Sequence, residues 1–301
     1  MKRFLIKIAI FFAIVAAVDF SLGWVFHYLQ DNIAGGRTGA EYYACKESNE
    51  AILIMGSSRA SHHYVPQVFT DSLGLDCYNL GQDGNGIILQ YGRWLMISER
   101  YKPRLIIYDV NPGFDLVEND NMTYIDRLKP FCNDNQVKAY IASIFPMERF
   151  KLMSKMYRYN YKFIELLSDC KKEEGTDKNL NGYIPLYGHI RTEMIGKGQS
   201  TGSGIIEEDS TKIRFLEQLA MDCQKKGTKL VFVASPSYSK NGRNINTFRA
   251  ISKISERYEI PFLYYYESDF SNNPDLFKDS HHLNNEGALL FSSEVAGKIN
   301  I

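Results

Sequence analysis

The chain has 301 residues, of which 45% are hydrophobic and 23% are charged. This composition is typical of a globular protein with one or two domains, and it excludes a disordered, collagen-like or multi-span membrane chain. The 35 basic and 35 acidic residues cancel. The chain therefore lacks the positive field that nucleic-acid binding depends on, and we expect no nucleic-acid partner.

An apolar segment near the N-terminus predicts a helix that crosses a membrane. Residues 8–28 are apolar with few exceptions. At about 1.5 Å per residue they form a helix of about 31 Å, close to the roughly 30 Å of a bilayer's hydrocarbon core. The basic residues before this segment are Lys2, Arg3 and Lys7. They keep the N-terminus cytoplasmic, so the bulk of the chain is expected on the extracytoplasmic side.

Residues 1–30 therefore form a signal anchor that tethers the protein by one N-terminal helix. The alternative is a signal peptide, cleaved near the small residues Ser21 and Gly23, in which case the body is secreted. Both interpretations export the rest of the chain.

Asp19 lies near the middle of the apolar segment. A carboxylate at that depth costs roughly 2.5–3.5 kcal/mol on insertion scales. One interpretation is that Asp19 is protonated or marks the end of a signal peptide. The other is that it pairs with a polar group of a partner membrane protein.

The cysteine pattern indicates neither a zinc site nor a disulfide framework. The five cysteines are Cys45, Cys77, Cys132, Cys170 and Cys223. They are far apart and odd in number, and no C-x-x-C motif occurs. One non-local disulfide stays open, and we expect no metal or other cofactor.

From about residue 50, short apolar runs alternate with helical patterns. The predicted strands are 51–55, 76–80, 104–108, 229–234 and 261–264, and the predicted helices are 87–101, 210–226, 245–258 and 285–299. Continuous apolar strands suit a parallel sheet that is covered on both faces. The alternation predicts an α/β fold, a three-layer α/β/α sandwich with a mostly parallel sheet of about five strands.

Between residues 113 and 209 this rhythm is interrupted. Residues 135–170 look helical with a break at Pro146, and residues 171–204 are polar and rich in glycine. Long irregular segments in compact domains are usually functional or mobile. We therefore expect residues 31–49 to be a linker and residues 50–301 an α/β domain in which 113–209 is a cap over the site. A peripheral decoration is the alternative for that insertion.

Four polar clusters follow predicted strands or precede the last helix, where open α/β sheets bind ligands. They are residues 56–59 (Gly-Ser-Ser-Arg), 79–86 (Asn-Leu-Gly-Gln-Asp-Gly-Asn-Gly), 109–112 (Asp-Val-Asn-Pro) and 279–287, which begins Asp-Ser-His-His. Each has an ordinary structural explanation when taken alone, because serine caps helices and glycine and asparagine form turns.

The last cluster contains the elements of a general base. A carboxylate three residues before a histidine can orient the imidazole, as Asp279 can for His282. His281 is the rival base, and an isolated histidine pair can also be a surface or metal-scavenging site. His62 and His63 lie one to two turns beyond Ser58, and we expect them at the surface or facing the cap.

Taken together, the four clusters resemble the SGNH/GDSL hydrolase superfamily. Its blocks are a G-D-S turn, a glycine, an asparagine in G-x-N-D, and a final D-x-x-H-x-N-x-x-G, which residues 279–287 match best. The resemblance covers about residues 50–112 and 210–301 and implies a flavodoxin-like sheet. Departures from the pattern are Ser57, Arg59, Asp109 and Pro112.

The resemblance implies a mechanism. Ser58 would be the nucleophile, His282 the general base and Asp279 its orienting partner. The oxyanion would be bound by the backbone N–H groups of Ser58 and Gly81 and by the Asn111 amide.

Three functions remain open. The first is an exported, membrane-tethered serine esterase or acyltransferase acting on O-acyl groups of cell-envelope glycans or lipids. The second is an accessory protein resembling the DltD type, which would contact a multi-span membrane-bound O-acyltransferase through Asp19. The third is a non-catalytic binding module, in which residues 81–86 would cradle an anion.

Overall fold

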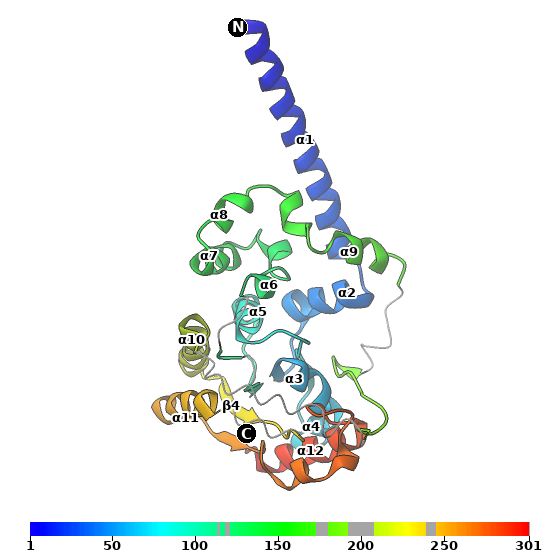
Figure 1. Ribbon diagram of the computed structural model, residues 1–301, viewed down its shortest axis with the longest axis vertical. Helices are drawn as coiled ribbons and strands as arrows, with labels where there is room; N and C mark the ends of the chain where they lie inside the picture. Colours follow the sequence, from blue (N-terminus) through cyan, green and yellow to red (C-terminus); the bar gives the residue numbers. More distant parts are fainter. Residues whose placement is uncertain (113–114, 118–120, 173–179, 192–207, 239–244, 301) are drawn as a thin grey trace. The chain divides into compact units, whose positions relative to one another are not determined.

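The computed structural model describes residues 1–112, 115–117, 121–172, 180–191, 208–238 and 245–300. The chain divides into two compact units (Figure 1). The first contains residues 1–46 and 122–175, and the second contains residues 47–121 and 176–301. Most of the polar segment predicted at 171–204 lies outside the described residues.

The second unit is built on one sheet of five strands. These are β1 (Ile52–Gly56), β2 (Cys77–Asn79), β3 (Leu105–Asp109), β4 (Lys229–Ala234) and β5 (Phe262–Tyr264). All neighbouring pairs are parallel, and the order is β2-β1-β3-β4-β5. In this order the chain changes direction across the sheet between β1 and β3, and such a switch point opens a crevice beyond the carboxyl ends of those strands.

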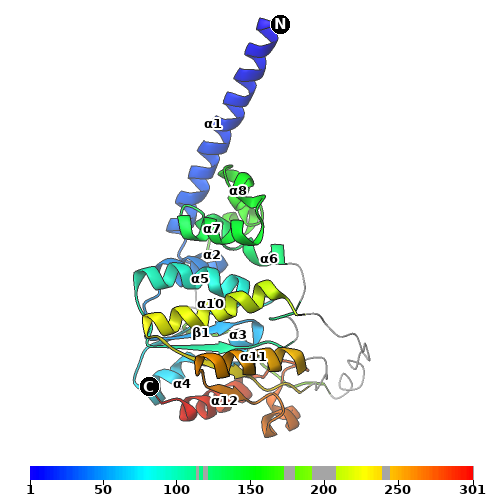
Figure 2. The same ribbon diagram turned by 90° about the vertical axis from the view of Figure 1, so that its left-hand side faces the viewer.

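Helices cover both faces of the sheet. They are α3 (Ser58–His63), α4 (Pro66–Leu73), α5 (Ile87–Arg100), α10 (Ser210–Lys226), α11 (Ile245–Tyr258) and α12 (Asn285–Lys298). Figure 2 shows α5, α10 and α11 together on the face turned to the viewer, and α4 packs with α12 on the other face. The predicted α/β/α sandwich is confirmed.

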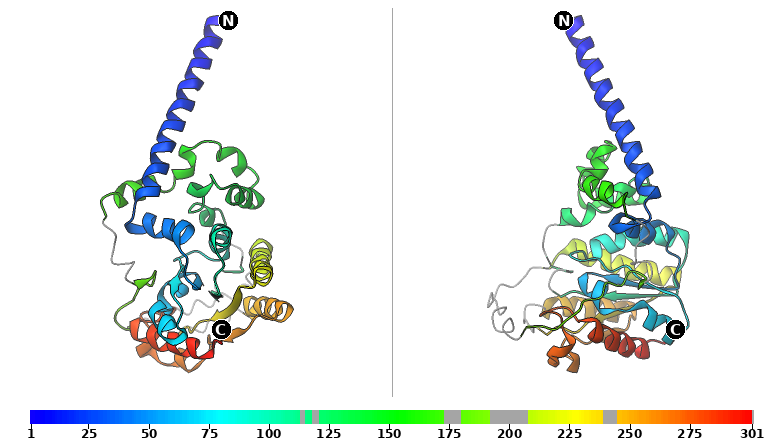
Figure 3. Two further views of the ribbon diagram at one scale, coloured as in Figure 1. Left: turned by 180° about the vertical axis from the view of Figure 1, so that it is seen from behind. Right: turned by 90° about the vertical axis from the view of Figure 1, so that its right-hand side faces the viewer.

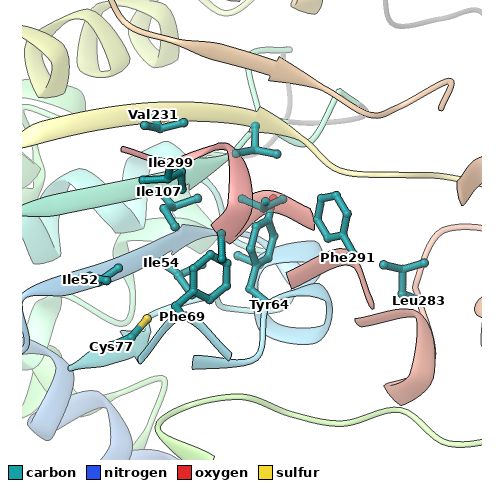
Figure 4. Close-up of a cluster of buried hydrophobic side chains, with 14 of the residues drawn as sticks. Ile52, Ile54, Tyr64, Phe69, Cys77, Ile107, Val231, Leu283, Phe291 and Ile299 are labelled. Atoms are coloured by element: carbon teal, nitrogen blue, oxygen red, sulfur yellow. The ribbon is translucent and has the colours of Figure 1, made fainter. Parts of the chain in front are cut away.

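The core explains why the sequences of the strands are continuously apolar. On one face, Ile54, Ile107 and Val231 lie in register across β1, β3 and β4. They pack against aromatic side chains from the helices on that face, among them Phe69 and Phe291 (Figure 4). All five residues of β1 are buried, because the opposite face is covered as well.

The first unit is helical (Figure 3). Its elements are α1 (Lys2–Asn32), α2 (Gly36–Tyr42), a π-helical turn (Tyr43–Glu47), α6 (Asn121–Ile125), η2 (Lys129–Phe131), α7 (Asn135–Ile144), α8 (Glu148–Lys151), η3 (Met156–Tyr159) and α9 (Phe163–Asp169). Helix α7 ends just before Pro146, as predicted. Residues 31–49, expected to be a linker, contain α2 and the π-helical turn. Residues 122–172, expected in a cap on the α/β domain, group with the N-terminal residues instead.

Helix α1 is the one helix among the described residues that is long and apolar enough to cross a membrane. Its Asp19 carboxylate is bonded within the chain. It accepts hydrogen bonds from the Ser154 hydroxyl, from the Lys155 N–H at 2.8 Å and from the Met156 N–H at 3.1 Å. The donors that the sequence analysis sought on a partner protein are therefore present in the first unit itself.

Candidate active site

Ser58 is the first residue of α3 and lies two residues beyond the end of β1. The turn depends on Gly56, whose φ of +143° is a conformation that other residues avoid. A Cβ at this position would also lie 2.7 Å from the Asp109 carbonyl oxygen of the neighbouring strand. The tight turn presents the half-buried Ser58 at the carboxyl edge of the sheet, at the β1/β3 switch point.

The Ser58 hydroxyl meets His282, which lies 224 positions further along the chain. His282 Nε2 is 2.8 Å from Ser58 Oγ, and His282 Nδ1 is 3.0 and 3.1 Å from the two carboxylate oxygens of Asp279. The carboxylate accepts the proton on Nδ1, which leaves a lone pair on Nε2 to accept the Ser58 hydroxyl proton. The three side chains therefore have the connectivity of a nucleophile, a base and an orienting acid.

Asp279 is held in place and kept ionised by its own loop. Its Oδ1 accepts the backbone N–H groups of His281 at 2.8 Å and His282 at 2.9 Å. Burial opposes the charge, but the hydrogen bond and the charge of His282 outweigh it and, with these N–H groups, lower the pKa of Asp279 to about 2. Asp279 is thus a carboxylate at neutral pH and can stabilise an imidazolium at His282.

His281, the rival base, points elsewhere. Its Nδ1 lies 3.5 Å from the Ser237 hydroxyl. Burial, together with the nearby charge of Arg59, lowers the pKa of His281. The structure places His282 at Ser58, as the D-x-x-H spacing predicts.

His62 and His63 were expected at the surface or facing the cap. Both are buried, so the surface alternative is wrong, whereas His62 does contact the 113–209 insertion at Ile184. His63 Nε2 accepts the Leu283 N–H at 3.0 Å, directly after His282. Burial above all lowers the pKa of His63, so it is a neutral support for the loop that carries the base.

His62 lies edge-on to His282, with 5.5 Å between ring centroids. Its Nδ1 is 2.7 Å from the Ile184 carbonyl oxygen, and its Nε2 is 3.2 Å from an Asp83 carboxylate oxygen. Burial opposes its charge, but these two acceptors raise the pKa of His62 above its ordinary value. Since both ring nitrogens face acceptors, the doubly protonated imidazolium satisfies the site best.

Of the predicted oxyanion donors, Asn111 lies beside the Ser58 turn, whereas the Gly81 N–H is bonded elsewhere. Asn111 follows β3 and lies beside the Ser58 turn, where its Nδ2 donates to the Ser57 hydroxyl at 3.1 Å. The Gly81 N–H is already used, because it donates to Asn79 Oδ1 at 2.8 Å. A Cβ on Gly81 would lie 2.2 Å from the Ser61 nitrogen. Gly81 therefore allows a loop to pack closely on α3, and its predicted role as an oxyanion donor does not fit this hydrogen bonding.

Two buried polar residues position the site in roles that the sequence analysis did not assign to them. Asn79 ends β2, and its Nδ2 donates to the carbonyl oxygens of Ala60 at 2.7 Å and Tyr64 at 2.9 Å, which ties α3 to the sheet. Asp115 accepts the Asn111 N–H at 3.3 Å and the Ile87 N–H at 2.9 Å, which joins the β3 loop to the start of α5. The available signal was an Asn near the end of a predicted strand and an Asp four residues after Asn111.

The Asn and Gly of the D-x-x-H-x-N-x-x-G block, Asn284 and Gly287, each have a structural role. Asn284 caps α12 by accepting the Gly287 N–H at 2.9 Å, and it donates to the Asp275 carbonyl oxygen at 2.7 Å. A Cβ on Gly287 would lie 2.3 Å from the Leu276 carbonyl oxygen. The residues after His282 thus anchor the base-bearing loop on the first turn of α12.

All five cysteines are unpaired, so the non-local disulfide left open by the sequence does not form. Within the described ranges, no cluster of three or more His, Cys, Asp or Glu side chains has the arrangement of a metal site.

Several solved structures resemble this chain. A candidate lipolytic protein of the G-D-S-L family from Desulfitobacterium hafniense is 11% identical, with 83% of this chain and 99% of that chain covered and a TM-score of 0.44. An acetylxylan esterase from Geobacillus stearothermophilus is also 11% identical, with 83% and 93% covered and a TM-score of 0.41. No protein-family model matches the sequence, and no curated protein matches it either. The assignment of chemistry therefore depends on the geometry of the site itself.

Proposed function

We propose that the chain is a membrane-anchored serine hydrolase of the SGNH type that cleaves carboxylic esters. The observation that carries the proposal is the continuous hydrogen-bond chain from Ser58 Oγ through His282 to Asp279. A serine hydroxyl is a weak nucleophile, and an oriented imidazole within hydrogen-bond reach is what activates it.

In this mechanism Ser58 Oγ attacks the acyl carbonyl carbon while His282 Nε2 takes the hydroxyl proton. Asp279 stabilises the imidazolium. The Ser58 N–H, which has no helical acceptor at the first position of α3, and the Asn111 amide are the donors for the oxyanion. The intermediate collapses as His282 passes its proton to the leaving alcohol. Water then attacks the Ser58 ester by the same steps, or a sugar hydroxyl replaces water and the acyl group is transferred.

The proposed substrates are O-acyl groups of cell-envelope glycans or lipids on the extracytoplasmic side. The support is α1, with basic residues before an apolar stretch. The last part of α1 is built into the first unit, since Gly23 packs on Lys155 and the ring of Phe26 on that of Tyr159. Cleavage after Gly23 would remove Gly23 together with Asp19, which accepts three hydrogen bonds from residues 154–156, and this favours an anchor over a signal peptide.

The test is covalent labelling of the full-length protein in detergent with a fluorophosphonate probe. We expect wild type to be labelled, Ser58→Ala to lose the label, and His282→Gln to be labelled at least a hundredfold more slowly. Ser168→Ala, which removes an exposed serine, is the matched control and keeps the label. Labelling that persists in Ser58→Ala, or fails in wild type, would refute the proposal and favour a binding module. Release of acetate from acetylated oligosaccharides, with and without a sugar acceptor, separates hydrolysis from transfer.

A further inference from the structure

The length of α1 places Asp19 inside the membrane. The uninterrupted apolar stretch from Ile8 to Val18 measures only about 17 Å at ~1.5 Å per residue, which is short for a hydrocarbon core of about 30 Å. Exposed apolar side chains continue past Asp19 as far as Trp24 and Val25, which extends the stretch to about 27 Å. Asp19, about 8 Å before Trp24 along the helix axis, then lies within the hydrocarbon boundary.

The segment that binds Asp19 lies at the same depth. Ser154, Lys155 and Met156 donate to the Asp19 carboxylate. One turn further along α1, the Lys155 backbone is so close to Gly23 that a Cβ there would lie 3.0 Å from the Lys155 carbonyl carbon. Residues 154–156 therefore run alongside α1 between Asp19 and Gly23, within the first unit.

The residues just before this contact turn apolar side chains outward. Met147, Phe150 and Met153 are 65%, 58% and 70% exposed, and they recur every three residues along α8 and the turn after it. Between them, Glu148 and Leu152 are buried. Burying a Phe or Met side chain is worth about 1.5–3 kcal/mol, so three such side chains on one short segment favour an apolar environment.

We infer that residues 147–156, here called the collar, insert into the outer leaflet of the bilayer that α1 crosses. Met147, Phe150 and Met153 contact acyl chains, and the residues after them satisfy Asp19. The occupant of this surface is phospholipid, because the segment leads directly into residues 154–156, which donate to Asp19 among the exposed apolar side chains of α1. Two exposed basic residues of α8, Arg149 and Lys151, are close enough in sequence for their long side chains to reach lipid phosphates. The inference rests on the proposed membrane anchor.

The collar also explains how a carboxylate is tolerated in the span. An ionisable group in hydrocarbon needs partners, and the collar supplies one hydroxyl and two backbone N–H donors to Asp19. These donors can only reach Asp19 if the backbone of residues 154–156 is itself within the membrane boundary. The polar group and the apolar side chains thus indicate the same depth.

The experiment measures depth in the purified full-length protein, reconstituted in nanodiscs of phosphatidylethanolamine and phosphatidylglycerol. The exposed Cys170 is replaced by Ser, and the other four cysteines are buried. A fluorescent NBD label is attached at Phe150→Cys or Met153→Cys, and quenching by lipids with a nitroxide at carbon 5 is recorded. Val15→Cys in α1 is the positive control. Leu290→Cys, an exposed apolar position on α12, is the negative control.

We expect the labels at 150 and 153 to be quenched at least threefold more than the label at 290 and to emit at shorter wavelength. If position 15 is quenched while 150 and 153 behave like 290, the collar is overturned and the anchor stands. If position 15 is not quenched, the anchor fails and the collar with it. Turnover of p-nitrophenyl acetate by the same samples reports separately on the proposed hydrolase activity.

Discussion

Replacing Asp279 with asparagine is the sharpest test of the proposed chemistry, because the change keeps the shape of the side chain. The Asp279 Oδ1 accepts two backbone N–H groups, from His281 and His282. In the variant, the amide oxygen stays with these donors, since reversing the amide would forfeit two hydrogen bonds worth about 0.5–1.5 kcal/mol each. The amide nitrogen then takes the place of Oδ2, 3.0 Å from His282 Nδ1.

An N–H donor at that position favours the His282 tautomer whose Nδ1 is an acceptor and whose Nε2 carries the proton. This tautomer cannot accept the Ser58 proton at 2.8 Å. The negative charge that stabilises the imidazolium is also lost. A triad held in the wrong tautomer loses on the order of 10⁴ in kcat, which corresponds to about 5.5 kcal/mol of transition-state stabilisation.

The assay is hydrolysis of p-nitrophenyl acetate, followed with thermal unfolding of the same preparation. We expect Asp279→Asn to unfold within about 2 °C of wild type, because its backbone hydrogen bonds are kept. Asp275→Asn, an exposed change nearby on the same loop, should retain activity. A variant at position 279 that hydrolyses within tenfold of wild type would refute the orienting role of Asp279. A variant that unfolds much earlier would indicate that loop folding, rather than the tautomer, has been changed.

Three further perturbations test other parts of the site. The pKa of His62 is raised in the folded state, so its contribution to stability is present below about pH 6.5 and is lost as pH rises through the folded pKa. Asp83→Asn should therefore lower the Tm by about 1–3 °C at pH 6 and by much less at pH 9, and a pH-independent difference would contradict this. Gly81→Ala keeps the backbone N–H but forces a Cβ against α3, so urea unfolding should show a loss of about 1–3 kcal/mol, whereas an oxyanion donor alone predicts unchanged stability. In a double-mutant cycle, Arg59→Met and Asp109→Asn should each cost about 3–5 kcal/mol and the double variant clearly less than their sum; strict additivity would show that the two side chains do not interact.

The strands and the long helices of the second unit could be predicted because their signals are local. Helix α10 occupies residues 210–226 as predicted. The side chain of Asp209 accepts the first free N–H groups, and Gly227 ends the helix at a φ of +68°. Both residue types are ordinary signals of helix ends. The sequence signal for the strands is equally local, since a strand buried on both faces must be apolar at every position.

The surroundings of the histidines on α3 could not be predicted in this way. Burial of His62 and His63 depends on Ile184 and Leu283, which come from distant parts of the chain. A six-residue helix carries too little periodicity to show which face is covered. The same limit explains Gly81, because its closest contact is the Ser61 backbone and a glycine in a loop does not show which backbone approaches it.

Two of the departures from the SGNH pattern involve side chains that lie next to each other in the folded protein. The pattern has an apolar residue after the serine and a glycine before Val110-Asn111, where this chain has Arg59 and Asp109. Gly56 and Asp109 are register partners in β1 and β3, so Arg59 and Asp109 are neighbours in space. Both side chains are buried, and either charge alone would be costly there.

Burial raises the pKa of Asp109, while the charge of Arg59 and the hydrogen bond from Tyr64 act in the opposite direction. Arg59 in turn donates to the Ser235 carbonyl oxygen at 3.4 Å and lies over the Tyr266 ring. Each residue offsets the burial of the other, so the pair could replace an apolar residue and a glycine together but not one at a time. The pair lies beneath the turn that presents Ser58, which means that the departures change what supports the nucleophile and leave its hydrogen bond to His282 in place.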